Sequence, residues 1–170
     1  MTTTAATTQT TSSDSAVRLR ETVRKAIAKR SFCTLATASA ANRPQVAGVL
    51  YAEADGALYV STLADSVKAR NIRANPNIAV TIPVRRLPIG PPSTIQFQGT
   101  AEILPLDDPR IHSLAASGTL KTVTSHGELT LPGGCFLKIT PARRINTYGI
   151  GMSLLTFIRN PLNAAGSVEL

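Results

Sequence analysis

The chain has 170 residues, of which 43% are hydrophobic and 16% are charged. This balance is typical of one folded globular domain and excludes a disordered or fibrous chain. The formal charge is +8, but aromatic residues make up only 4% and tryptophan is absent, so we expect no base-stacking surface and no nucleic-acid partner.

The N-terminal segment is rich in Thr, Ser and Ala. Residues 1–15 have no basic start followed by an apolar run, so the sequence predicts a disordered tail and no secretory signal. No apolar run reaches the roughly 20 residues that cross a bilayer, so we expect no membrane span. Cys33 and Cys135 lie far apart and form no CxxC motif. We therefore expect two buried, reduced cysteines in a cytoplasmic protein.

Residues 17–30 form a basic segment with helical periodicity. The segment holds six Lys or Arg residues against one acidic residue, Glu21. Leu19, Val23 and Ile27 recur at every fourth position, which is the spacing of a helix packed on a core. We expect a helix with a solvated charged face; a nucleic-acid or membrane surface is the alternative.

Three predicted strands follow, each rich in small and β-prone residues, at 31–39, 45–53 and 57–62. Turn signals separate them at Asn42-Arg43-Pro44 and at Asp55-Gly56. The pattern predicts a meander of antiparallel strands. The stretch DSVKARNIRANP (65–76) then predicts a short helix capped by Asp65 or Ser66.

The second half continues with apolar and alternating segments. A fourth strand is predicted over 77–84, and the proline-rich stretch 85–92 is expected to be a constrained loop. Residues 93–104 predict the longest strand, with Gln98 on its polar face and a bulge or close backbone approach at Gly99.

The last elements are less uniform. Asp108 and Pro109 are typical of a helix start, and Gly118 of a helix stop. Residues 119–133 are ambiguous, 135–149 predict a final strand bent at Pro141, and 150–170 predict a helical turn and tail. The whole pattern predicts a mainly β fold: a six-stranded antiparallel split β-barrel with two or three peripheral α-helices. We expect a tail over 1–15, the barrel domain with its N-terminal helix over 16–150 and a C-terminal extension over 151–170.

The motifs of common catalytic sites are missing from the sequence. It has no GxSxG, no Walker-type loop, no GxGxxG after a strand and no HExxH. His112 and His126 lie apart without neighbours at ligand spacing, so we expect no metal site, and no residue is assigned a catalytic role. If the protein is an enzyme, a cofactor supplies the reactive group.

One segment carries a binding signal. In YVSTLADSVKARN, the hydroxyls of Ser61, Thr62 and Ser66 and the ammonium group of Lys68 converge on a helix start. Backbone N–H groups in the first turn of a helix lack partners, so this arrangement is suited to an anion such as a phosphate. An ordinary strand–helix connection with a solvated lysine is the alternative.

The order of these motifs resembles a known family. LATAS, a turn, RPQVAGVLYAE, DG and ALYVST are followed by SxKxxN, three residues and NP before an apolar strand. Over residues 17–148 this order is similar to the pyridoxamine 5′-phosphate oxidase-like split β-barrel family, especially its actinobacterial flavin/deazaflavin oxidoreductases. The resemblance implies a homodimer with two cofactor sites at the interface. Members bind FMN, the deazaflavin coenzyme F-420 or, in some branches, haem.

The resemblance also implies which residues bind the cofactor. Residues that hold the phosphate map to Ser61, Thr62, Ser66 and Lys68. The strand that maps to Val46–Leu50, with Gly48 and Val49, lies against the ring system largely through its backbone. Many relatives carry arginine where Ser66 stands, so the resemblance implies weaker clamping of the phosphate here.

Three further side chains are pocket candidates: Arg85, Gln98 and Tyr148, with a purely structural role as the alternative for each. The basic residues around the predicted site favour F-420, with its phosphodiester and polyglutamate tail, over FMN. We therefore expect a reductase that transfers a hydride from F-420, or second from FMN, to a small organic substrate. The alternative is a non-catalytic carrier or sensor of a cofactor, haem or lipid-like ligand on the same barrel.

Overall fold

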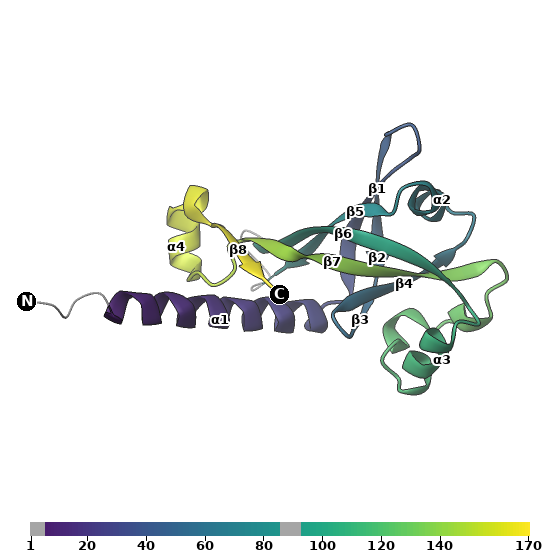
Figure 1. The fold of residues 1–170 in the computed structure, drawn as a ribbon, viewed down its shortest axis with the longest axis horizontal. Coiled ribbons are helices and arrows are strands. Elements are labelled where there is room, and N and C mark those ends of the chain that lie inside the picture. Colours follow the sequence, from purple (N-terminus) through teal and green to yellow (C-terminus); the bar gives the residue numbers. More distant parts are fainter. Residues whose placement is uncertain (1–5, 86–92) are drawn as a thin grey trace, which may run out of the picture.

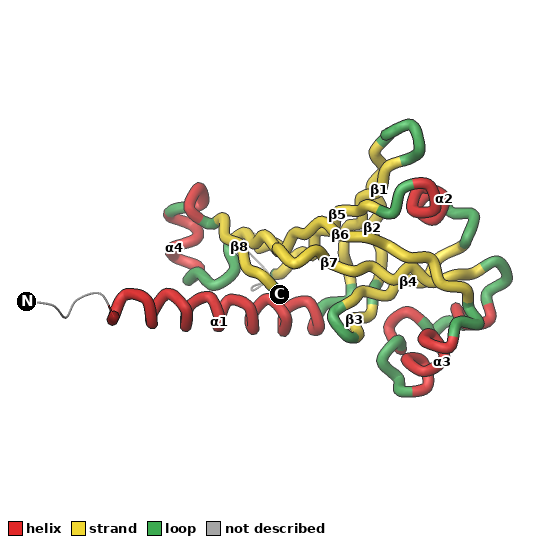
Figure 2. The backbone as a smooth tube through the Cα atoms, viewed as in Figure 1, coloured by secondary structure: helices red, strands yellow, loops and turns green. Residues whose placement is uncertain are grey.

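The computed structural model describes residues 6–85 and 93–170, with side chains from Asp14 onward (Figure 1; Figure 2). The described strands are β1 (Phe32–Ala38), β2 (Pro44–Leu50), β3 (Ala52–Ala54), β4 (Ala57–Leu63), β5 (Asn77–Val84), β6 (Ser93–Pro105), β7 (Gly134–Tyr148) and β8 (Ala165–Glu169). The helices are α1 (Ala6–Lys29), α2 (Val67–Ala74), α3 (Pro109–Ala116) and α4 (Leu154–Arg159). Three 3-10 helices complete the set: η1 (Lys121–Val123), η2 (Glu128–Thr130) and η3 (Pro161–Asn163).

The sheet curls into a barrel, and its two edge strands are joined in the chain by a single residue, Tyr51. Its strands pair antiparallel in the order β2-β1-β5-β6-β7-β4-β3, and β8 adds to β7. β2 and β3 stand at opposite edges of this order, yet only Tyr51 separates them in the chain. The sheet therefore curls until its edges meet, and β2 lies beside β4 across a seam without strand pairing. The fold is mainly β, an antiparallel split barrel with peripheral helices, as predicted. The described chain has eight strands where six were predicted and four α-helices where two or three were predicted.

Two hydrophobic clusters hold the barrel together. Alternate strand residues fill the interior, among them Leu35, Val60 and Phe97. A smaller cluster lies between the outside of the sheet and the segment after β6, with Ile111 of α3 and Phe136 of β7 among its members. Residues 57–60 of β4 are buried on both faces of the strand because they lie between these two clusters.

The two cysteines lie in the core as predicted, buried and not bonded to each other. Burial raises the pKa of the Cys33 thiol to about 12. Burial also raises the pKa of Cys135, against the opposing effect of the nearby Arg73 and Lys68.

Helix α1 packs through the predicted apolar stripe. Val23 and Ile27 are buried and Leu19 is partly buried, whereas most of the basic residues of the segment are exposed. At the end of the helix the hydroxyl of Tyr51 donates a 2.7 Å hydrogen bond to the carbonyl of Ile27. This bond ties α1 to the junction where the barrel closes.

The turn and cap signals of the sequence are confirmed. Asp55 and Gly56 both have positive φ, at 51° and 76°, as a tight hairpin turn requires. The Asp108 carboxylate caps α3 by accepting a 2.8 Å hydrogen bond from the N–H of Arg110, and Pro109 is the first helical residue.

Gly99 also has the predicted role. The register between β6 and β7 shifts between Phe97 and Gly99, and Gly99 lies opposite Pro141. A Cβ at Gly99 would lie 2.2 Å from the carbonyl oxygen of Thr140, so the strands approach too closely for a side chain.

Several element predictions differ from the structure. The strand predicted over 45–53 divides into β2 and β3 because the chain crosses from one sheet edge to the other at Tyr51. Residues 150–170 form more than a helical turn and tail: β8 pairs with residues 144–148 of β7. The ambiguous stretch 119–133 contains η1 and η2.

The N-terminal helix is longer than the sequence predicts. Helix α1 begins at Ala6, inside the 1–15 segment for which the sequence predicts disorder. Amphipathic packing of residues 19–27 holds the second half of this helix on the core. Residues 1–5 and most of the predicted 85–92 loop, Arg86 included, lie outside the described residues. The division at 16–150 and 151–170 stays a prediction. None of the described helices has the length and hydrophobicity needed to cross a membrane.

Candidate functional site

A cavity of about 420 Å³ lies at the seam between β2 and β4. Its walls are backbone and side chains of Gly48–Leu50 on β2 and Ser61–Leu63 on β4, together with Lys68 of α2. β2 and β4 are not paired by hydrogen bonds, so a space remains between the two strands. These residues line that space from both sides. Five residues predicted from the sequence meet here: Gly48, Val49, Ser61, Thr62 and Lys68.

Lys68 is the cation of this cavity. It is the second residue of α2 and half-buried, and no hydrogen bond or ion pair of its ammonium group is found with the described part of the chain. Arg70 and Arg73 of the same helix are engaged differently: they donate hydrogen bonds to the carbonyls of Asp65 and Ala64. Those two arginines hold the β4–α2 connection in place, so of the α2 cations only Lys68 lines the cavity.

Ser66 does not line the cavity but supports it. Its hydroxyl caps α2 by accepting a 3.4 Å hydrogen bond from the N–H of Ala69, and it accepts another from the hydroxyl of Thr62 at 3.3 Å. The side chain therefore links the end of β4 to the start of α2. Its role in the described chain is that of the predicted helix cap.

The opposite wall comes from residues within 119–133, the stretch whose structure was ambiguous from the sequence. Thr122, Val123, His126, Glu128 and Leu131 of the η1–η2 region line the cavity. The Glu128 carboxylate accepts a 2.7 Å hydrogen bond from the N–H of His126, and this bond holds the pKa of the carboxyl below its usual range. No periodicity marks this segment, so spacing could not have identified it.

The other predicted site residues lie elsewhere. Val46 and Gln98 are exposed on the outer face of the sheet, and Arg85 lies beyond β5, where its carbonyl accepts a hydrogen bond from Arg30. Tyr148 packs edge-on against Phe157 of α4, with ring centroids 5.2 Å apart. None of these four lines the seam cavity of a single chain.

Val46 and Gln98 nevertheless share a surface. Two cross-strand rows run over β2, β1, β5 and β6: Gly48, Thr34, Thr81 and Gln96 in one, and Val46, Ala36, Ala79 and Gln98 in the other. Neither row contains a charged residue. Phe32, Val46 and Leu50 are 46%, 62% and 55% exposed on the same strands. We call these two rows, with Phe32 and Leu50, the uncharged outer face.

The cavity suits a phosphorylated flat ring in its size and its donors. Its volume falls within the roughly 300–1,000 Å³ range of small-molecule sites. The hydroxyl of Ser61 and the ammonium group of Lys68 offer donors to an anion beside the first turn of α2, whereas the Thr62 hydroxyl already donates to Ser66. Gly48 presents bare backbone, with only the Phe32 ring near its missing Cβ, at 3.0 Å. Among the described residues no cluster of His, Cys, Asp and Glu could hold a metal ion.

Comparison with known proteins gives a family and a fold. The family model described as pyridoxamine 5′-phosphate oxidase matches residues 19–147. A search of curated proteins gives no match. Among solved structures, the haem storage protein HutZ of Vibrio cholerae is 18% identical with a TM-score of 0.67, over 78% of this chain and 96% of that one.

Two further structures have the same fold. A haem-binding protein of Mycobacterium smegmatis is 17% identical with a TM-score of 0.69, over 89% of this chain but only 57% of its own. An F-420 reductase is 19% identical with a TM-score of 0.50, over 69% of this chain and 91% of that one. At these identities the likeness establishes the fold alone. The family match, which spans most of the barrel, establishes more: the chain belongs to the pyridoxamine 5′-phosphate oxidase family.

Proposed function

We propose that the protein is a cofactor-dependent oxidoreductase that binds the deazaflavin coenzyme F-420, or FMN as second choice, in the seam cavity. The observation that carries the proposal is the convergence of Gly48, Ser61, Thr62 and Lys68 on one cavity. Family membership and the likeness to an F-420 reductase support it. When bound, the reduced ring would supply a hydride to a small organic substrate.

The residues of the chain would bind and orient the cofactor. Lys68 and the hydroxyl of Ser61 would donate to the phosphate or phosphodiester, and Thr62 would line the same end of the cavity with its hydroxyl bonded to Ser66. The backbone of β2 at Gly48 and Val49 would lie against the ring. Ser66 would not contact the cofactor; its hydroxyl would hold α2 and Thr62 in place through hydrogen bonds. Its short side chain cannot replace the second cation expected from the family pattern, so we expect moderate affinity.

We further propose that two copies form a dimer through the uncharged outer face. Large exposed apolar side chains and the lack of charge over both rows favour association. In such a dimer the outer face of one protomer, with Val46 and Gln98, would border the seam cavity of the other. Val46 and Gln98 would then take part in a cofactor site, as predicted, although neither lines the cavity of its own chain.

Titration of the purified protein with F-420 and with FMN tests the proposal. Saturable binding of one of them, followed by turnover of the reduced form with an electron acceptor, is the expected result. Absence of binding for both below roughly 100 µM would exclude a usable site for either. Binding without turnover for a broad set of acceptors would favour a carrier.

A haem carrier is the second candidate, and His126 favours it. The imidazole lines the seam cavity, and its side chain is 84% exposed and therefore accessible to an iron ion. Both haem-binding structures above have this fold. Addition of haem should then give a saturable Soret band that shifts in His126→Ala but not in His112→Ala. Equal spectra for the three proteins would exclude His126 as the ligand.

A further inference from the structure

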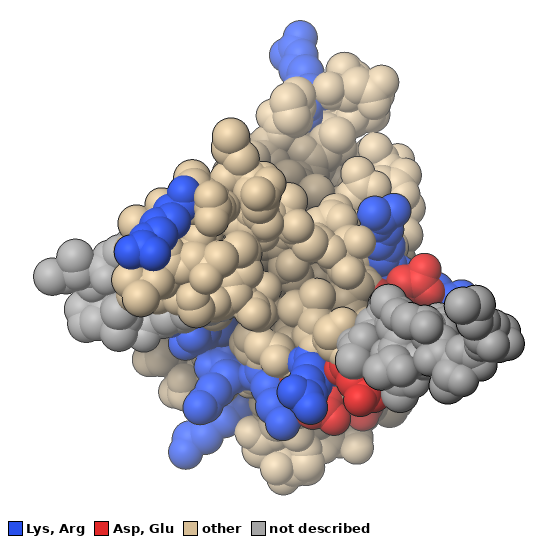
Figure 3. Space-filling view, turned by 90° about the vertical axis from the view of Figure 1, so that its left-hand side faces the viewer, with Lys and Arg blue, Asp and Glu red and all other residues tan. Residues whose placement is uncertain are grey.

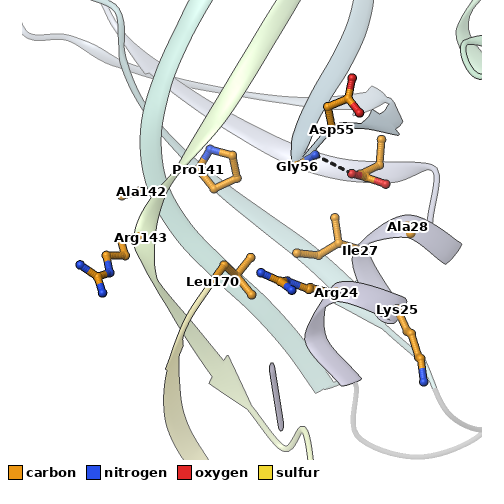
Figure 4. A pocket seen from close by; sticks show the side chains of 11 residues that line it. Arg24, Lys25, Ile27, Ala28, Asp55, Gly56, Pro141, Ala142, Arg143 and Leu170 are labelled. Carbon is orange, nitrogen blue, oxygen red and sulfur yellow. Dashed lines mark hydrogen bonds between the residues drawn. The ribbon is translucent and has the colours of Figure 1, made fainter. Parts of the chain in front are cut away.

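A second cavity lies away from the seam. It is a groove of about 660 Å³ between α1, the β3–β4 turn and β7 (Figure 4), and it shares no lining residue with the seam cavity. Neither the family match nor the proposed cofactor site assigns a role to it. We call it the α1 groove.

The groove exists because β7 changes partner along one side. β4 pairs with residues 134–139 of β7, and β8 pairs with residues 144–148. Residues 140–143 between them pair with no described strand on that side, although the carbonyl of Arg143 accepts a 2.9 Å hydrogen bond from the N–H of Leu170. The register shift opposite Gln98 adds length to β7 here, and Pro141 has no N–H to offer a ladder. Helix α1 crosses this gap and forms the other wall.

An apolar surface and one cation face the groove. Ile27, Pro141 and Leu170 supply the apolar part, and Figure 4 shows the Arg24 side chain extending from α1 across the groove toward Leu170. No hydrogen bond or ion pair of Arg24 is found among the described residues. This guanidinium group is therefore available to a ligand.

The other two cations at the rim are already engaged. Lys25 pairs with Glu21 at 3.7 Å, and Arg143 pairs with Glu169 at 3.1 Å. In Figure 4 the side chains of both point away from the centre of the groove. Among the described residues that line the groove, only Arg24 combines an unpaired charge with a position over the apolar surface.

Two carboxylates stand at the β3–β4 turn. Glu53 accepts a 2.9 Å hydrogen bond from the N–H of Gly56, and Asp55 lies at the tip of the turn. The groove is therefore polarised, with its cation on the α1 side and its carboxylates on the turn side. An anionic group is attracted to the Arg24 end and repelled from the other, which fixes the direction in which a ligand would lie.

We propose that the α1 groove binds a small organic anion: an apolar body on Ile27, Pro141 and Leu170 with one carboxylate- or sulfonate-like group on Arg24. Its volume suits a ligand of drug size. A guanidinium group is the side chain best suited to hold such a planar or branched anion through paired hydrogen bonds. This site is independent of the proposed cofactor site.

Two fluorescent probes of similar shape test the proposal. The anionic probe is 8-anilinonaphthalene-1-sulfonate, and the neutral one is N-phenyl-1-naphthylamine. We expect the sulfonate to bind saturably to the full chain, and Arg24→Gln to weaken it about tenfold, which is the effect of a lost charge-assisted hydrogen bond. The neutral probe should bind Arg24→Gln and the unaltered protein equally.

The matched control is Lys25→Gln, which removes the same charge from the next position of the helix. It should leave sulfonate binding unchanged, and Ala28→Trp, which fills the exposed edge of the groove, should abolish binding of both probes. Equal loss in Arg24→Gln and Lys25→Gln would show attraction by net charge and overturn the site. Full retention of binding in Ala28→Trp would also overturn it.

A reciprocal pair of measurements separates this site from the cofactor site. Lys68→Ala should leave sulfonate affinity unchanged, and Arg24→Gln should leave FMN affinity unchanged. Weaker sulfonate binding in Lys68→Ala would place the probe in the seam cavity and overturn the proposal for the α1 groove. Failure of both F-420 and FMN to bind any of these proteins would contradict the cofactor proposal without affecting the groove.

Discussion

At the scale of single residues, Lys68 is the side chain on which the cofactor proposal depends most. Its ammonium group lines the seam cavity and makes no ion pair in the described chain. Replacing it with alanine should weaken FMN or F-420 binding about tenfold to a hundredfold, since a hydrogen bond to a charged group contributes roughly 1.5–3 kcal/mol. Isothermal titration calorimetry would measure this loss.

Lys121→Ala is the control for that change. Lys121 is exposed next to Thr122 of the cavity wall but does not line the cavity, so it carries the same charge nearby without the contact. We expect its removal to change affinity less than twofold, in keeping with a screened surface charge. If both lysine variants bind equally well, Lys68 does not contact the cofactor.

Gly99 makes a separate prediction for stability. Gly99→Ala would place a methyl group against the Thr140 carbonyl, which belongs to the backbone and cannot move away cheaply. We expect a loss of about 3 kcal/mol in urea unfolding. In Gly48→Ala the new methyl meets only the exposed Phe32 ring, so the loss should stay below about 1 kcal/mol. Similar losses at the two sites would contradict this account.

At the scale of elements, α2 positions Lys68 and is itself held by polar contacts. The buried side chain of Asn71 donates a 3.0 Å hydrogen bond to the Thr37 hydroxyl on β1. Thr37 donates in turn to Gln45 on β2, at 3.2 Å. This chain of contacts connects α2 to the strand whose backbone lines the cavity.

Asn71→Ala should therefore affect both stability and binding. Loss of the buried hydrogen bond should reduce the free energy of unfolding by about 2 kcal/mol, and release of α2 should weaken FMN binding as well. Asn77→Ala, at an exposed position of β5, should change neither quantity by much. Thermal unfolding with and without FMN would compare the two. Unchanged stability in Asn71→Ala would show that the contact does not hold α2.

The elements also show which parts of the molecule could be predicted from the sequence. Local signals such as Asp108-Pro109, Asp55-Gly56 and Gly99 act within a few residues, and the structure confirms each of them. Strand β8 and the wall around His126 depend on contacts between distant segments, and no periodicity marks them. The seam cavity was predictable in part because Ser61, Thr62 and Lys68 lie close together in sequence. Its far wall was not, since 50 or more residues separate it from β4.

At the scale of the whole molecule, the uncharged outer face makes a prediction about assembly. Val46→Asp would introduce a charge within the proposed interface, at a position that is 62% exposed in the single chain. We expect sedimentation to change from dimer to monomer, with little effect on unfolding of the monomer. Leu162→Asp, on the 95% exposed Leu162 beside α4, is the control. Dissociation by Leu162→Asp alone would place the interface at α4 instead.

The raised pKa of the buried Cys33 thiol predicts how the free energy of unfolding depends on pH. The Cys33 thiol loses its proton near the ordinary pKa of 9.0 in the unfolded chain but only near 12 in the folded protein. Between these values the unfolded chain binds fewer protons, so stability should fall as pH rises from about 9 toward 12. Urea unfolding at pH 8 and pH 10 would show the decline, and Cys33→Ala should reduce it. An unchanged decline in that variant would assign it to other groups, such as Tyr51, whose pKa burial also raises.

The closure of the barrel at Tyr51 has a consequence for motion. β2 and β4 meet without strand hydrogen bonds, and both are held firmly by their other neighbours, β1 and β7. The two strands can therefore separate without breaking a ladder, at a cost well below that of unfolding the domain. A flat ring could enter between β2 and β4 from the side. The hydrogen bond from the Tyr51 hydroxyl to the Ile27 carbonyl of α1 would meanwhile hold the connection between β2 and β3 in place. We therefore expect any opening of the seam to turn about the junction at Tyr51.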